Sequence, residues 1–73
     1  MRLPSLSARE VVRAFGKAGY ALDRQTGSHL ILYHPGERRT LSIPNHNPVK
    51  RGTLRTLIRL SGMTIDQFLG LLR

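Results

Sequence analysis

The spacing of apolar residues changes twice along the chain, and this change constrains the fold more than any other feature. From Val11 to Ala18 apolar residues recur at intervals of three and four, as on one face of a helix. From Tyr20 to Ile43 they alternate with polar residues, as along half-buried strands. Helical spacing returns at Leu54. The chain is therefore predicted to have an α+β fold, with one helix, several strands and then further helices.

Local signals predict where the first helix begins and ends. Ser7 and Glu10 have the spacing of a capping box, in which each side chain accepts a hydrogen bond from the other residue's backbone N–H. Gly19 suits the left-handed position that follows a helix. The helix is therefore expected to end just before Gly19, with Tyr20 folding back against Phe15.

Three strands separated by short turns are expected in the alternating region. They cover the ranges 20–25, 29–34 and 38–43, with turns at Thr26-Gly27 and Pro35-Gly36-Glu37. Short turns between neighbouring strands indicate an antiparallel meander. On the middle strand Leu30 and Leu32 should face the core, while His29, Ile31 and Tyr33 should share the opposite face.

Two more helices are expected after the loop from Pro44 to Pro48. Leu54, Leu57 and Ile58 form an apolar stripe, and a second capping box at 64–67 begins a short final helix. The predicted order is α-β-β-β-α with a short last helix. Helices on one face of a three-stranded antiparallel sheet would leave its other face open. Because no repeat or linker divides the chain, a single domain covering 1–73 is expected.

The composition indicates a polyanionic partner. Twelve Lys and Arg against four acidic residues give a net charge of +8. Such an excess attracts nucleic acid or an acidic protein, although a basic surface can also serve solubility alone. The absence of cysteine excludes disulfides and thiolate chemistry. No apolar run approaches the roughly 20 residues that span a bilayer, and the N-terminus lacks signal-peptide features, so a cytoplasmic protein is predicted.

Four short segments occur in order along the chain: Gly19-Tyr20, Arg24-Gln25-Thr26-Gly27-Ser28-His29, Ile43-Pro44-Asn45-His46 and Gly52-Thr53-Leu54-Arg55. Together they resemble the HicA (YcfA-like) family of toxins. The resemblance implies a fold similar to a double-stranded-RNA-binding domain and an mRNA interferase activity that a HicB-type antitoxin neutralises. It also implies that the functional histidine of the family is His29.

The chemistry of imidazole agrees with that role. A histidine near neutral pH can take a proton from a ribose 2′-OH or return one to a leaving oxygen, which permits RNA cleavage without a metal. His46 is a second catalytic candidate, because cleavage benefits from a base and an acid on opposite sides of the phosphate. The alternative for His29 is a surface histidine without a catalytic role. The alternative for His46 is a histidine that only occupies a turn. The four acidic residues lie in separate elements, so neither a metal site nor another cofactor is expected.

RNA binding is assigned to basic, hydroxyl and aromatic side chains outside the catalytic pair. The candidates are Arg24, Ser28, Tyr33, Arg38, Arg39, Lys50, Arg51 and Arg55. The arginines and the lysine suit phosphates, helped by the helix start near Gly52, and Tyr33 can stack on a base. For each of these residues considered alone, the alternative is a side chain on a solvated surface that does not contact RNA.

Two other functions fit the same pattern. The first is a non-catalytic RNA-binding module in which His29 only contacts phosphate. The second is an interaction protein whose basic face is made for an acidic antitoxin rather than for RNA. If an antitoxin is the partner, it is expected to cover the open sheet face and to bury Ile31 and Tyr33.

Overall fold

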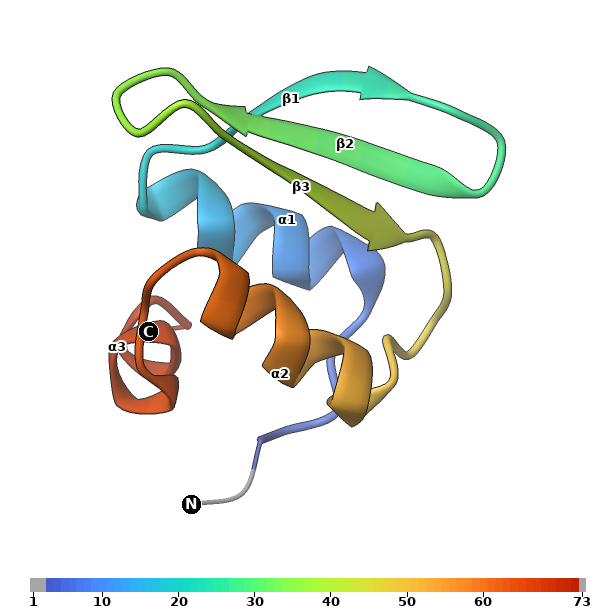
Figure 1. Ribbon diagram of the computed structural model, residues 1–73. Coiled ribbons are helices and arrows are strands. Elements are labelled where there is room, and N and C mark those ends of the chain that lie inside the picture. Colours follow the sequence, from blue (N-terminus) through green and yellow to red (C-terminus); the bar gives the residue numbers. More distant parts are fainter. Residues whose placement is uncertain (1–2, 73) are drawn as a thin grey trace.

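The computed structural model describes residues 3–72, so Met1, Arg2 and Arg73 of the expected 1–73 domain lie outside the described residues. The elements are α1 (Ala8–Lys17), β1 (Ala21–Gln25), β2 (His29–His34), β3 (Arg39–Pro44), α2 (Arg51–Leu60) and α3 (Ile65–Gly70). The strands form one antiparallel sheet in the order β1-β2-β3. Figure 1 shows α1 and α2 against one face of this sheet, with the other face uncovered. The predicted α+β class, element order and open sheet face are confirmed.

The ends of α1 form as predicted. The Ser7 hydroxyl accepts a hydrogen bond from the Glu10 N–H at 3.1 Å, and the Glu10 carboxylate accepts one from the Ser7 N–H at 2.9 Å. The bond from the Ser7 backbone lowers the pKa of Glu10. At the other end Gly19 has a φ of 104°, and the Tyr20 ring meets the Phe15 ring edge to face at 5.6 Å. The turn out of α1 therefore brings an aromatic side chain back into the core.

The core fills the space between the sheet and the helices. Leu32, Leu41 and Ile43 reach it from the sheet, and each is at most 1% exposed. Other buried members come from all three helices and the segments beside them: Leu3, Leu6, Ala8, Val11, Ala14, Phe15, Tyr20, Val49, Leu54, Leu57, Ile58 and Phe68. The strand alternation predicted from the sequence is thus confirmed for β2 and β3.

β1 contains an irregularity that the sequence analysis did not anticipate. Leu22 pairs with Leu32, but the next pairing joins Arg24 to Ile31, so Asp23 is an extra residue in β1. Directly paired residues in an antiparallel sheet share a face. The bulge therefore moves Arg24 to the open face and turns the following residue, Gln25, toward the helices.

The turn between β2 and β3 is one residue longer than predicted. Arg38 has a φ of 52°, so it belongs to the turn, and β3 begins at Arg39. The predicted start at Arg38 is therefore wrong, because a left-handed residue cannot continue a strand.

His34 holds this turn against the end of α1. Its Nδ1 accepts a hydrogen bond from the Glu37 N–H at 3.0 Å, so Nε2 must carry the proton that it shares with the Ala18 carbonyl at 3.1 Å. The ring packs edge to face on Tyr20 at 5.0 Å and fills the space that a side chain at Gly19 would need. His34 therefore serves the fold.

Tyr20 provides a first test of the core. Its hydroxyl is buried and has no hydrogen-bond partner among residues 3–72. Replacing Tyr20 with Phe removes an unpaired polar group, so we expect the free energy of unfolding at pH 7 to rise by about 1 kcal/mol. Tyr33→Phe, at the exposed end of the same sheet, is the matched control.

The same substitution should change the pH dependence of stability. Burial raises the pKa of Tyr20, so the unfolded chain ionises first as the pH rises. The stability that the neutral phenol contributes is full below a pH of about 10 and is lost as the pH rises through the pKa of the folded state. Urea unfolding at several alkaline pH values should show a flatter decline for Tyr20→Phe. A variant less stable than the parent at pH 7 would contradict this account.

Candidate functional site

The turn between β1 and β2 fixes the first residue of β2, His29. The Thr26 hydroxyl accepts a hydrogen bond from the His29 N–H at 3.1 Å, and the Thr26 N–H donates to the His29 carbonyl at 2.9 Å. The Ser28 carbonyl accepts from the Asn45 N–H at 2.9 Å, which ties the turn to the end of β3. The backbone that carries His29 is therefore held on both sides.

The His29 side chain is exposed on the open face of the sheet. Its Nδ1 lies 3.0 Å from the Ser28 hydroxyl. Its Nε2 has no hydrogen-bond partner among the described residues, 3–72. One ring nitrogen is thus oriented by a neighbour and the other faces a space where a ligand can lie.

That space is a shallow pocket that contains both predicted catalytic histidines. It has a volume of about 280 Å³ and is lined by His29, Pro44, His46, Lys50 and Thr53. Pro44 is the cross-strand partner of His29, and the His46 N–H donates back to the Pro44 carbonyl at 2.8 Å. This tight turn after β3 brings His46 to the pocket, although it lies 17 residues after His29 in the sequence.

The start of α2 forms the other wall of the pocket. The first N–H groups of a helix have no partner inside it, and no side chain caps α2. Lys50 is the residue before the helix and Thr53 is in its first turn. The space beside Gly52 is open. Backbone donors, the positive end of the helix and one ammonium group therefore favour an anion here.

The remaining predicted ligands of RNA occupy several parts of the surface. Arg24 lies on the open face beside Ile31, two residues along β2 from His29. Tyr33 is 39% exposed at the far end of β2. Arg38 is exposed in the turn between β2 and β3, and Arg55 is exposed on α2. Only Arg24 and Tyr33 share the sheet face of His29.

Two of the predicted ligands have partners within the fold. Arg39 donates to the Leu60 carbonyl at 3.0 Å and pairs with Glu37 at 3.3 Å. Arg51 donates to the Leu3 carbonyl at 2.9 Å. These contacts link α2 to β3 and to the N-terminal segment, so we leave both arginines out of the proposed RNA surface.

Several residues of the site were not singled out from the sequence. Thr26, Asn45 and Thr53 either fix His29 or line the pocket. All three lie in the segments that carry the HicA resemblance, which was the available signal. Within residues 3–72 no three His, Asp or Glu side chains are grouped so as to hold a metal ion. In the same range no helix has the length and apolar character to cross a bilayer.

Comparison with known families decides the relationship. The family model described as the HicA toxin of bacterial toxin–antitoxin systems matches residues 8–63, which is 56 of the 73 residues. The chain belongs to the HicA toxin family. No curated protein matches it. The matched range contains the whole sheet, α1, α2 and every residue of the histidine pocket, while α3 lies beyond it. As a HicA toxin, the chain belongs to a system in which an antitoxin is the partner.

Proposed function

We propose that this HicA-family protein is a cytoplasmic endoribonuclease toxin that cleaves mRNA without a metal. The observation that supports the proposal is the shared pocket of His29 and His46 beside the uncapped start of α2. This arrangement offers two proton-transfer groups and an anion site in one place. These are the elements that cleavage of a ribose phosphodiester requires.

His29 acts as the general base in this proposal. When Nδ1–H donates to the Ser28 hydroxyl, Nε2 holds a lone pair. That nitrogen takes the proton of a ribose 2′-OH, and the 2′-oxygen attacks the adjacent phosphorus. Ser28 therefore serves as a positioning residue that selects the ring form needed for the reaction.

His46 acts as the general acid. As the new bond between the 2′-oxygen and phosphorus forms, the bond from phosphorus to the 5′-oxygen breaks, and protonated His46 supplies the proton to that oxygen. The products are a 2′,3′-cyclic phosphate and a 5′-hydroxyl. Lys50 and the N–H groups at the start of α2 stabilise the negative charge on the phosphate oxygens.

The experiment is incubation of purified protein with end-labelled RNA in EDTA, with analysis of the new ends. Scission that leaves cyclic or 3′-phosphate ends would support the proposal. Tight binding without scission would instead make the protein a non-catalytic RNA-binding module. A requirement for an added divalent metal would also contradict the mechanism.

Lys50 should contribute to RNA affinity through a phosphate contact. Replacing Lys50 with Ala is expected to weaken binding. It should also reduce the magnitude of the slope of log affinity against log salt by about 1, because one fewer counterion is released. Lys17, the other lysine, lies at the end of α1 and provides a matched control. Binding isotherms for uncleavable RNA at several salt concentrations measure both slopes. Equal slopes for Lys50→Ala and Lys17→Ala would show that Lys50 does not make the proposed phosphate contact.

The antitoxin in this proposal is a HicB-type protein that blocks the same pocket. Its binding surface would include the open sheet face, where Ile31 and Tyr33 present apolar surface on the same side as His29. A partner seated there would exclude RNA from the pocket by steric overlap.

A further inference from the structure

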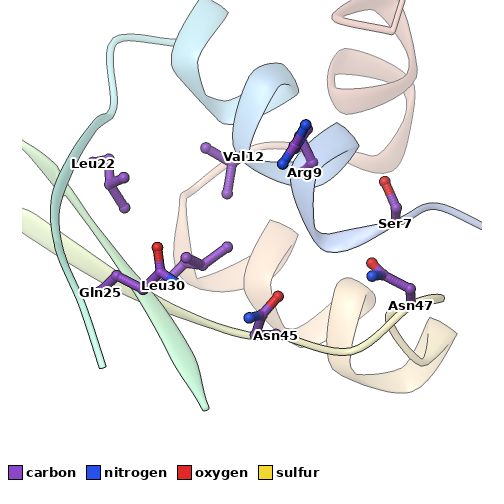
Figure 2. Close-up of a pocket in the computed structure, with 8 residues that line it drawn as sticks. All are labelled: Ser7, Arg9, Val12, Leu22, Gln25, Leu30, Asn45 and Asn47. Atoms are coloured by element: carbon purple, nitrogen blue, oxygen red, sulfur yellow. The ribbon is translucent and has the colours of Figure 1, made fainter. Parts of the chain in front are cut away.

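A second and larger pocket lies on the other side of the sheet from the exposed ring of His29. It has a volume of about 490 Å³ and lies between α1, the edge strand β1, the start of β2 and the loop after β3. Figure 2 shows its lining side chains, which come from all four segments: Ser7, Arg9, Val12, Leu22, Gln25, Leu30, Asn45 and Asn47. The proposed reaction uses none of these side chains.

One wall of the pocket is apolar and is only partly covered by the protein. Val12, Leu22 and Leu30 form this wall (Figure 2). Leu22 is 51% exposed, although its cross-strand partner Leu32 is 1% exposed on the same side of the sheet. An aliphatic surface of this kind suits the flat face of an aromatic ring.

Amide groups line the pocket beside this apolar wall. The bulge at Asp23 turns Gln25 into the pocket, and Asn45 reaches it from the loop (Figure 2). The Asn47 side-chain oxygen accepts a hydrogen bond from the Ala8 N–H at 2.9 Å, so its NH₂ group remains to donate. Amides offer both donors and acceptors, which is what the hydrogen-bonding edge of a nucleobase requires.

The charge of the pocket suits an anionic ligand such as a nucleotide and disfavours a basic peptide side chain. Arg9 is exposed at the rim, and none of the eight lining residues is acidic. A guanidinium can bind the phosphate of a nucleotide whose base lies against the amides. The volume also falls within the range of about 300 to 1,000 Å³ that is typical of small-ligand sites.

The loop after β3 separates this pocket from the histidine pocket. Pro44 and His46 line the histidine pocket, whereas Asn45 and Asn47 line the larger one. Successive side chains from the end of β3 into the loop therefore reach the two sites in alternation. The Asn45 N–H also donates to the carbonyl of Ser28, the residue beside His29. The two pockets are therefore lined by neighbouring residues, next to the backbone that carries His29.

We propose that the larger pocket binds the base of a nucleotide next to the cleaved phosphodiester and so sets the sequence preference of cleavage. This inference rests on the proposed ribonuclease function. The base packs against Leu22 and Val12, and its edge is read by Gln25 and Asn45. Arg9 contacts the phosphate on the far side of that nucleotide.

The first test measures binding apart from cleavage. Isotopically labelled His29→Ala protein is titrated with AMP, GMP, CMP and UMP, each to millimolar concentration, and observed by NMR. At least one nucleotide should shift the side-chain amide signals of Gln25 and Asn45. Adding Leu22→Ala or Gln25→Ala should weaken that affinity by about fivefold to tenfold, as expected for a lost apolar or hydrogen-bond contact.

Leu60→Ala is the matched control, because Leu60 is a leucine of similar exposure, 56%, on α2 and outside the pocket. It should leave nucleotide affinity unchanged. No response at the pocket to any of the four nucleotides would overturn the proposal. A response to the antitoxin alone would overturn it in favour of a protein ligand.

The second test uses the active protein and a pool of RNA with random sequence. Gln25→Ala should relax the base preference at one position beside the cleaved bond by about fivefold or more, while Leu60→Ala keeps the parental preference. If the parent cleaves selectively and Gln25→Ala retains that selectivity, the subsite is wrong and the ribonuclease proposal stands. If the parent cleaves nothing, the ribonuclease proposal fails, and the nucleotide titration still decides whether the pocket binds a base.

Discussion

Replacing His29 with alanine should lower the rate of RNA cleavage by about a hundredfold or more, which is the usual contribution of a general base. The loss should appear in the chemical step, because the mechanism above assigns transfer of the 2′-OH proton to His29. His46→Ala should also lower the rate, through loss of the proton to the leaving oxygen. RNA affinity should change much less, since Lys50 and the start of α2 remain.

The structure predicts that this loss occurs without unfolding. The His29 ring is exposed, and within residues 3–72 its one side-chain hydrogen bond joins it to the neighbouring Ser28. Thermal melts of the parent and His29→Ala should therefore nearly coincide, and single-turnover cleavage of end-labelled RNA in EDTA should separate them. A variant that cleaves at the parental rate would remove His29 from the reaction. A variant that unfolds would make this histidine structural.

His34→Ala is the matched histidine control for that experiment. His34 bonds to the Ala18 carbonyl and accepts from Glu37, so its loss should lower stability and not the chemistry at the pocket. Cleavage by this variant should be compared at a temperature where it remains folded. The two histidines of one strand would then show opposite effects on stability and on rate.

Local signals predicted most of the fold. Both capping boxes form, since each needs only two side chains at fixed spacing. The alternation of Leu30, Ile31 and Leu32 predicted the two faces of β2, because it too depends only on neighbouring residues. The bulge at Asp23 and the left-handed Arg38 were missed. Both features depend on the register in which two complete strands pair, and no short sequence pattern predicts that register.

The site was predicted less completely than the fold. His29 and His46 are 17 residues apart, and this separation does not predict that they share a pocket. The pocket depends on how the loop after β3 and the start of α2 pack beside His29. Net charge also failed to tell surface arginines from structural ones. For Arg39, however, a signal was available, since it shares the strand parity of Leu41 and Ile43 and therefore faces the helices.

The largest effect on stability is expected at Leu32. This side chain is 1% exposed in the centre of the core, so Leu32→Ala removes buried contacts and leaves a cavity. Such truncations cost about 2 to 5 kcal/mol. A chain of 73 residues has a total stability of roughly 4 to 11 kcal/mol on general grounds, so this single change removes a large part of it.

Ile31, the preceding residue, is the matched control for this prediction. Its side chain is half-buried on the open face of the same strand, so Ile31→Ala should cost less than about 1.5 kcal/mol. Urea unfolding of both variants measures the difference. Equal losses would mean that the open face is as well packed as the core, which would contradict the two faces assigned to β2. The exposed position of His29, two residues earlier on the face of Ile31, depends on that same assignment.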